Sequence, residues 1–374
     1  MSQKKIYLIL LLFSFFQTLN VSVLPFLILD ISQNPNVYSF SFGLFSFGMF
    51  FGSVILGRLS DRIGRKYIVI GLIPVYSILQ MWLTIIDAVS LLYIIRFLSG
   101  FALAGVTANA IPLIMENMKN SEKIIENFTI YSSLLISLGT MIGGVMSSYI
   151  SRNSPLILQL GLSIILSLIM SKTIINEPIK DKIPSKGDVK ISKIQWKIIT
   201  INSLYILIFF FLLQGSRFIL LTQMEISPAL NGYISAYTGI FGLFIGRLLY
   251  PKIKKKFGDF KVLYFAYFIL CIGIVFLTIS MNIISIIVFL TLCIAPQNLV
   301  KIPTNIILTQ NIKRNKGYIF GVNNAAISLF SALGSMLVGP GIKYLDTNSF
   351  FISFALALIL YPLTISLKAK AAQT

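Results

Sequence analysis

The sequence contains no histidine, only two cysteines and only twelve acidic residues among 374. Without histidine, imidazole-based catalysis and histidine proton relays are excluded. Cys271 and Cys293 both lie in apolar segments, so the sequence indicates neither a disulfide framework nor a metal site. No phosphate-binding loop occurs, so direct use of ATP is not expected. We therefore expect a protein that is not an enzyme, with no catalytic residues, no cofactor and no metal.

Apolar residues make up 56% of the chain and charged residues 11%, with a mean hydropathy of +0.87. These values lie far outside the range of soluble globular domains. A helix needs about 20 mostly apolar residues to cross the hydrocarbon core of a bilayer. The composition therefore predicts a multi-pass integral membrane protein whose main surroundings are the lipid bilayer.

The net charge of +19 raises the possibility of nucleic-acid binding. Most of the 31 Lys and Arg residues, however, fall in the segments between apolar spans that would face the cytoplasm if the N-terminus is cytoplasmic. Such a bias follows the positive-inside rule for short loops. Membrane topology therefore explains the charge, and we expect cytoplasmic N- and C-termini and no nucleic-acid partner.

Hydropathy predicts twelve membrane spans, the first of them retained as a helix rather than removed as a signal peptide. Their expected limits are 6–30, 38–57, 67–86, 90–115, 127–150, 155–174, 197–220, 229–250, 262–280, 283–308, 317–340 and 349–367. The polar segment 175–196, rich in Lys and containing Pro178 and Pro184, is typical of a cytoplasmic linker. We expect an N-terminal six-helix bundle over 1–174, this linker, and a C-terminal six-helix bundle over 197–374.

Shifting the sequence on itself by 194 residues aligns the two halves and indicates an internal duplication. Matched pairs include Phe47 with Phe241, Gly48 with Gly242, Gly52 with Gly246 and Gly64 with Gly258. The halves also differ, since Asp61 falls on Lys255 and only the first half keeps the acid. We expect function to concentrate at such differences.

The most specific motif is a charged run of ten residues between the second and third spans, Gly57-Arg58-Leu59-Ser60-Asp61-Arg62-Ile63-Gly64-Arg65-Lys66. It resembles the signature loop of the major facilitator superfamily, G-x-L-a-D-r-x-G-r-k, at every defining position. The resemblance implies an all-α membrane fold of two pseudo-symmetric six-helix bundles. It also implies a secondary transporter of the cell membrane with a substrate site near the midplane, for which we expect a monomer.

We interpret the signature run as a tight turn in which glycines permit the bend and the acid accepts hydrogen bonds. The resemblance further implies a gating latch that involves the start of the eleventh span and an acid at the end of the fourth. The expected gating residues are Gly57, Asp61, Arg62, Gly64, Arg65 and Glu116. The alternative is that these charges only fix the topology.

Arg96 lies within the fourth span, four residues before Gly100, a spacing similar to a second motif of the superfamily. A charge deep in a span costs about 2.5 to 3.5 kcal/mol on insertion scales. Its partner in the repeat, Leu290, is neutral, so the architecture does not require the charge. Arg96 is therefore a functional candidate, with donation to carbonyl groups of a neighbouring helix as the structural alternative.

The fifth span is similar in part to the superfamily's antiporter motif, g-x-x-x-G-P-x-x-G-G. Gly139, Gly143 and Gly144 match, whereas Thr140 replaces the proline and Leu135 replaces the first glycine. The incomplete match supports exchange only weakly. Close helix packing is the alternative function of these glycines.

Other polar residues in the spans are candidates for substrate binding or coupling, with hydrogen bonding between helices as the structural alternative. They are Arg217, Lys301, Gln17, Asn20, Asn109, Gln214, Gln297, Asn298, Asn305, Asn323 and Asn324. Asn20 and Gln214 are repeat equivalents, so both halves present an amide at the same depth. The two cations either share a cavity with Arg96 or extend their charged ends to the membrane surfaces.

These features predict a secondary active transporter that works by alternating access on a small-molecule substrate. Cations in the spans and carboxylates only at their rims, such as Asp30 and Glu225, favour a small organic anion or a neutral metabolite. One alternative is a drug or organic-solute efflux antiporter driven by protons, with a proton as the coupling ion. An alternative of another class is a membrane receptor that does not transport.

Overall fold

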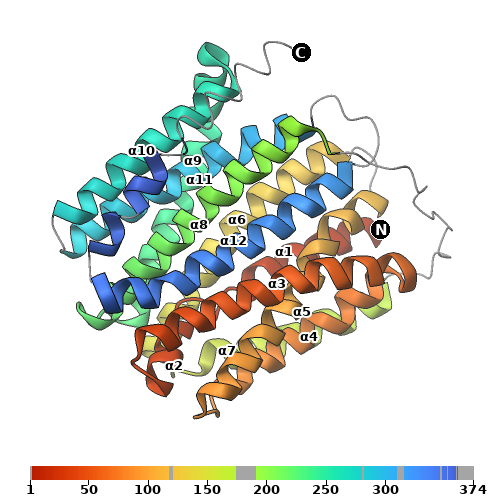
Figure 1. Cartoon of the computed structure of the whole chain (residues 1–374). Coiled ribbons are helices and arrows are strands. Elements are labelled where there is room, and N and C mark those ends of the chain that lie inside the picture. Colours follow the sequence, from red (N-terminus) through yellow and green to blue (C-terminus); the bar gives the residue numbers. More distant parts are fainter. Residues whose placement is uncertain are drawn as a thin grey trace. The chain divides into compact units, whose positions relative to one another are not determined.

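The computed structural model describes residues 2–117, 121–173, 191–279, 282–309, 316–345, 348–351, 353–358 and 360. Nearly all of these residues are helical, and no strand occurs among them (Figure 1). The predicted linker 175–196 lies outside the described residues up to position 190, and so does most of the C-terminal part of the twelfth span. Six of the described helices are long and apolar enough to cross a membrane, and shorter apolar helices accompany them.

The first predicted span is not one helix, which corrects the expectation of a continuous segment over 6–30. It is divided into α1, Ser2–Phe16, and α2, Leu24–Ile31 (Figure 1). Between them, amides such as those of Thr18, Leu19 and Val21 bond to the carbonyl three residues earlier, in tight turns. The apolar composition of the segment conceals this break, because hydropathy measures only the affinity for lipid.

The rest of the first half forms long helices joined by short connections. These are α3, Pro35–Ile63; α4, Arg65–Trp82; α5, Val89–Asn117; α6, Ser121–Tyr149; and α7, Ser154–Thr173. Helix α4 packs against α5 and α7, and α1 packs against α6 and α7.

The second half repeats this order of long helices. They are α8, Lys193–Thr222; α9, Pro228–Phe257; α10, Asp259–Ile279; α11, Ile283–Thr309; and α12, Lys316–Leu345. Helix α8 packs against α11 and α12, and α10 packs against α11. A capping box at Ser192 and Gln195 starts α8, because each side chain bonds to the backbone amide of the other.

Contacts group the chain into two compact units that we describe separately. Unit 1 contains Met1–Gln33, Leu44–Asp188 and Ile226–Tyr237, and unit 2 contains Asn34–Gly43, Val189–Glu225 and Thr238–Thr374. The first turns of α3 therefore pack with the second half of the chain, and the first turns of α9 pack with the first half. The division into bundles at 1–174 and 197–374 stays a prediction.

The signature run is mostly helix rather than a turn of ten residues, which corrects the interpretation from sequence. Helix α3 continues to Ile63 and α4 begins at Arg65, so Gly64 alone makes the break, with φ of +98°. Gly57 lies inside α3, and a methyl group added to it would meet no atom within 4 Å. Charged residues at the membrane surface do not stop a helix whose backbone hydrogen bonds are already made within the segment.

The repeat equivalent of Gly64 behaves in the same way. Gly258 has φ of +78° and lies between α9 and α10. Both glycine amides bond to the carbonyl four residues earlier, those of Ser60 and Lys254. These two pairs are themselves related by the shift of 194 residues, so the duplication seen in the sequence extends to the backbone conformation.

Candidate functional site

The break in the first span exposes backbone groups inside unit 1, and neighbouring helices supply their partners. The hydroxyl group of Tyr76 in α4 donates to the carbonyl oxygen of Gln17, at 3.1 Å. The amide group of Asn231 in α9 donates to the carbonyl oxygen of Ser22, at 2.9 Å. In a bilayer such groups find no water, so non-helical backbone persists only where protein groups or a cavity satisfy it. Tyr76 and Asn231 thus stabilise the two ends of the break.

Helix α6 packs closely along the same break. The hydroxyl group of Thr18 donates to the carbonyl of Ile136 at 3.0 Å, and that of Ser22 donates to the carbonyl of Thr140 at 2.9 Å. A side chain at Gly143 would overlap the carbonyl oxygen of Leu19. Thr140, which stands where the antiporter motif has proline, therefore uses its carbonyl group to bind the broken span.

Next to the break lies a group of polar side chains inside unit 1 that we name the Tyr76 cluster. Its members are Gln17, Asn20, Tyr76, Gln80, Arg96 and Gln159. Tyr76 lies beside the side chains of Asn20, Gln80 and Gln159 and close to Arg96. All members but Gln17, which is half-buried, are buried. The cluster therefore joins the first, third, fourth and sixth spans around one polar centre.

Arg96 is 2% exposed, so its guanidinium group lies inside the protein rather than against lipid. The guanidinium carbon lies 4.3 Å from the centre of the Phe45 ring in α3, a cation–π contact. Helix α3 comes close enough for this contact because a side chain at Gly100 would overlap the carbonyl oxygen of Phe45. The packing of α3 on α5 thus holds the charged group in place.

Three positions of the Tyr76 cluster have apolar equivalents in the second copy. The positions equivalent to Tyr76, Gln80 and Arg96 are Leu270, Ile274 and Leu290, all of which are buried apolar side chains. The break is also absent there, since α8 is continuous through the residues equivalent to 17–23. The shared architecture therefore requires neither the polar cluster nor the broken span, and both are specialised features of the first copy.

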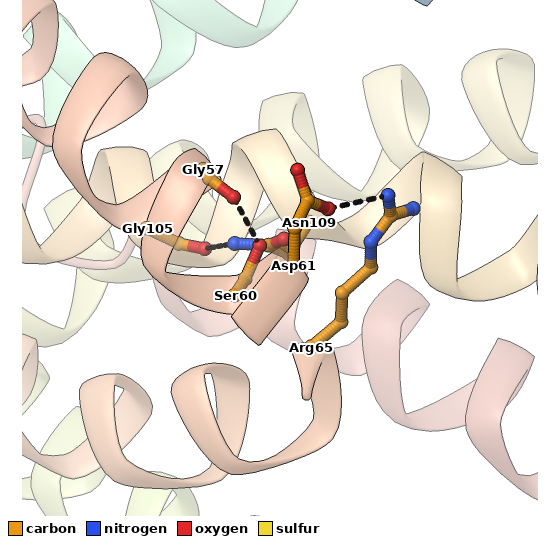
Figure 2. Close-up of polar contacts among 6 residues, drawn as sticks. All are labelled: Gly57, Ser60, Asp61, Arg65, Gly105 and Asn109. Carbon is orange, nitrogen blue, oxygen red and sulfur yellow. Dashed lines mark hydrogen bonds and ion pairs between the residues drawn. The ribbon is translucent and has the colours of Figure 1, made fainter. Parts of the chain in front are cut away.

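The gating residues predicted from the signature run lie at the junction of α3 and α4 (Figure 2). Arg65 pairs with Asp61 across Gly64, at 2.9 Å, and both side chains are partly exposed. The hydroxyl group of Ser60 donates to the carbonyl oxygen of Gly57 at 2.6 Å. Arg62 is exposed, while the side chain of Glu116 lies outside the described residues. The pair between Asp61 and Arg65 is thus described, and the latch to the fourth and eleventh spans stays a prediction.

Asn109 is buried in α5 beside this end of α3 (Figure 2). Its side-chain amide donates to the carbonyl oxygen of Gly105 in the same helix, at 2.7 Å. A bond of this kind satisfies the donor locally and does not join two helices.

The remaining candidates are distributed over unit 2. Arg217 is half-buried near Tyr38, Gln214 is buried, and Lys301 is exposed on α11. The cavity predicted to unite Arg217 and Lys301 with Arg96 stays a prediction, because Arg96 belongs to unit 1.

Asparagine side chains of unit 2 also differ in their surroundings. Asn323 is buried and accepts a hydrogen bond from Asn202 of α8, at 3.2 Å, whereas Asn324 is exposed. The side chains of Asn298 and Asn305 lie outside the described residues, and Gln297 is half-buried.

Sequence reasoning did not select Tyr76, Gln80, Gln159 or Asn231. Three of them are neutral amides and the fourth is one of 16 tyrosines, so none of them stands out in the sequence as a charge does. The alignment of the two halves could have revealed these residues, because polar Tyr76 and Gln80 align with apolar Leu270 and Ile274 in the second copy.

A model of the major facilitator superfamily matches residues 6–335. The chain belongs to this superfamily. It is accordingly a multi-pass integral membrane transporter and not an enzyme, and the all-helical fold expected from the sequence is confirmed.

Two curated relatives are similar over most of their length. The quinolone resistance protein NorA of Staphylococcus aureus (strain MRSA252) is 24% identical over 335 residues, which cover 85% of this chain and 84% of NorA. Multidrug resistance protein 1 of Bacillus subtilis (strain 168) is 24% identical over 395 residues, which cover 99% of this chain and 98% of that protein.

Solved structures of the same fold match nearly the whole chain. The nucleoside transporter NupG superimposes with a TM-score of 0.77 at 11% identity, covering 98% of this chain and 100% of NupG. A bacterial homologue of the iron transporter ferroportin superimposes with a TM-score of 0.72 at 16% identity, covering 98% of each chain. At such low identity these similarities show a shared fold alone.

Proposed function

We propose that this superfamily member exports small organic solutes in exchange for protons. The observation that carries the proposal is the similarity to two resistance proteins, NorA and multidrug resistance protein 1, over nearly the full length of the chain. The partial antiporter motif adds support, since Gly139 and Gly143 pack directly on the broken first span. Neither of these two resistance proteins supports uptake of an anion or neutral metabolite, which the sequence favoured.

Exchange for protons requires a group that titrates, and the span interiors contain no carboxylate. The carboxylates at the ends of the first and seventh spans are the candidates. Asp30 pairs with Arg152, which follows α6. Glu225 has φ of +46°, a conformation that is uncommon for a residue with a side chain and is often found at functional positions. We propose Asp30 and Glu225 as the proton-coupling groups.

Transport in liposomes tests this proposal. We would reconstitute the purified protein into liposomes and impose a pH difference across their membrane. The accumulation of a fluorescent quinolone and, separately, of the cationic dye ethidium would then be measured. We expect accumulation of either probe that depends on the pH difference and falls at least about tenfold in Asp30→Asn or Glu225→Gln. Asp87→Asn, at an exposed acid before α5, is the matched control.

Two outcomes of the liposome assay would contradict the proposed function. Failure of both probes to respond to the pH difference, with protein that is folded and inserted, would overturn export by proton exchange. Unchanged transport in both carboxylate variants would overturn the assignment of the coupling groups while leaving the exchange itself intact.

An organic anion as substrate is a second candidate function, favoured by the buried charge of Arg96. It predicts that a membrane potential, rather than a pH difference alone, changes the rate of transport. Imposing each gradient separately in the same liposomes distinguishes the two candidates.

A further inference from the structure

The junction of α9 and α10 in unit 2 is strongly basic. Five lysines and a single acid, Asp259, lie within ten residues; the lysines are Lys252, Lys254, Lys255, Lys256 and Lys261. In the repeat, Lys255 and Asp259 align with Asp61 and Arg65, so the second copy has the charges of that ion pair in reversed order. The side chain of Asp259 lies outside the described residues. A pair between Lys255 and Asp259 would neutralise one lysine and leave the charge of the other four.

Two of these lysines meet at one aromatic ring. The Nζ atom of Lys256, at the end of α9, lies 5.2 Å from the centre of the Phe257 ring. The Nζ atom of Lys261, in the first turn of α10, lies 5.3 Å from the same centre. Both lysines are exposed, and Phe257 is 47% exposed. The turn at Gly258 thus brings two ammonium groups from consecutive helices to one accessible place.

An apolar stripe continues from Lys261 along α10. Phe265, Phe268 and Ile272 follow Lys261 by four, seven and eleven residues, and all three are exposed. Residues at this spacing lie on one face of an α-helix. Leu270, on the opposite face, is fully buried. Because contact of the exposed face with water would be unfavourable, the acyl chains of lipids are its expected cover.

The combination of cations and stripe restricts the chemistry of a ligand. Ammonium groups attract a phosphate group, and clusters of lysine at the end of a membrane helix favour anionic lipid head groups. A free phosphate compound would use the lysines without the stripe, and a zwitterionic lipid would use the stripe with little gain from the lysines. An anionic phospholipid uses both.

Two positions of this surface differ in the first copy of the repeat. Tyr67 aligns with Lys261, and Gly71 aligns with Phe265. The shared architecture therefore requires neither the cation at the start of α10 nor the aromatic ring below it.

We propose that the junction of α9 and α10 binds an anionic phospholipid. Lys256 and Lys261 bind the phosphate group of the lipid, and one acyl chain lies along Phe265 and Phe268. The site is independent of the proposed export, because it lies on a surface that faces lipid and its test measures binding without transport.

Thermal unfolding of the purified full chain in a neutral detergent tests the proposal. We would follow unfolding by the fluorescence of Trp82 and Trp196 while adding dioctanoyl-phosphatidylglycerol as the probe. The probe is expected to raise the Tm saturably, by about 3 °C near saturation, because a ligand that binds only the folded state stabilises it. Dioctanoyl-phosphatidylcholine, with the same chains but no net charge, and glycerol 3-phosphate, without chains, should leave the Tm unchanged.

Variants locate the effect. The double variant Lys256→Gln with Lys261→Gln should weaken the affinity for the probe at least about tenfold, and the corresponding double arginine variant should retain it. Lys343→Gln is the matched control, since Lys343 is an exposed lysine 5.4 Å from the ring centre of Tyr344, at the end of α12. It should keep the full rise in Tm. All the altered side chains are exposed, so the variants are expected to fold.

Four outcomes would overturn the proposal. The first two are a Tm that does not respond to phosphatidylglycerol in the unaltered protein and an equal response in the double glutamine variant. An equal rise with glycerol 3-phosphate would indicate a site for a free phosphate compound, and an equal rise with phosphatidylcholine would indicate general solvation by lipid. None of these results bears on export by proton exchange, which the liposome assay measures separately.

Discussion

At the scale of single residues, glycine determines how closely the helices of unit 1 approach one another. A side chain at Gly48 would overlap the carbonyl oxygen of Phe97, and one at Gly139 would overlap that of Phe15. In lipid, where no hydrophobic effect drives helices together, such close packing is a main source of association. The glycines of the partial antiporter motif therefore allow close helix packing, which the structure shows directly. Their role in exchange stays a proposal.

Gly143 gives the sharpest test of this packing. We expect Gly143→Ala to lower the free energy of unfolding by about 1 to 3 kcal/mol, because the new methyl group overlaps the carbonyl oxygen of Leu19 and the helices must separate. Gly161→Ala in α7 is the matched control, since no atom lies within 4 Å of its added methyl group. It should be neutral or more stable by up to about 1 kcal/mol. Unfolding in detergent measures both, and equal stability of the two variants would contradict the packing argument.

At the scale of elements, two kinds of interruption organise the helices. Gly64 and Gly258 separate consecutive helices at equivalent positions of the two repeats. The break at 17–23 divides the first span, whereas its equivalent in α8 is continuous. The first kind belongs to the shared architecture and the second to one copy, so the second kind is the better candidate for a functional feature. Discontinuous helices line binding sites in several transporter folds.

The glycine interruptions predict a specific pattern of stability. Gly64→Ala and Gly258→Ala should each cost about 1 to 3 kcal/mol, because a side chain strains the backbone at positive φ. Gly57→Ala, in the same signature run but within α3, should be neutral or slightly stabilising. Thermal unfolding of the three variants checks this order. A loss at Gly57 equal to that at Gly64 would restore the interpretation of the whole run as a turn.

At the scale of the whole molecule, the contact units do not follow the sequence halves. The first turns of α3 belong to unit 2, where a side chain at Gly43 would overlap that of Met336 in α12. The first turns of α9 belong to unit 1, where Asn231 bonds to the broken span. Two segments thus exchange partners between the halves.

The orientation of the whole chain in the membrane can be tested. The positive-inside rule places the junction of α3 and α4 in the cytoplasm and the turn between α6 and α7 outside. With Cys271 replaced by serine, a cysteine at Ser151 should react with an impermeant maleimide in intact cells. A cysteine at Ile63, exposed at the other junction, should react only after permeabilisation. The reverse pattern would show the opposite orientation.

Much of the fold could be predicted from the composition and from the spacing of apolar runs and glycines. Particular residues show where such prediction failed. The apolar runs predicted the helices, and the glycine-punctuated signature run predicted the superfamily, as the family match confirmed. The prediction that this run forms a tight turn was wrong, since the residues from Gly57 to Ile63 continue α3. Arg96 was found because a charge in a span is conspicuous, whereas Gln80 and Gln159 were missed because amides are not.

The sequence by itself determined that the chain is an integral membrane protein, that its two halves are related in sequence, and that Arg96 and Asp61 distinguish the first half from the second. These properties depend on the chemistry of each residue and on periodicity along the chain, both of which are local. Only the tertiary structure decided that the first span is broken, that Tyr76 and Asn231 stabilise the break, and that buried amides lie around Tyr76. Those features arise where segments distant in sequence meet, because backbone groups released from one helix must find partners on others.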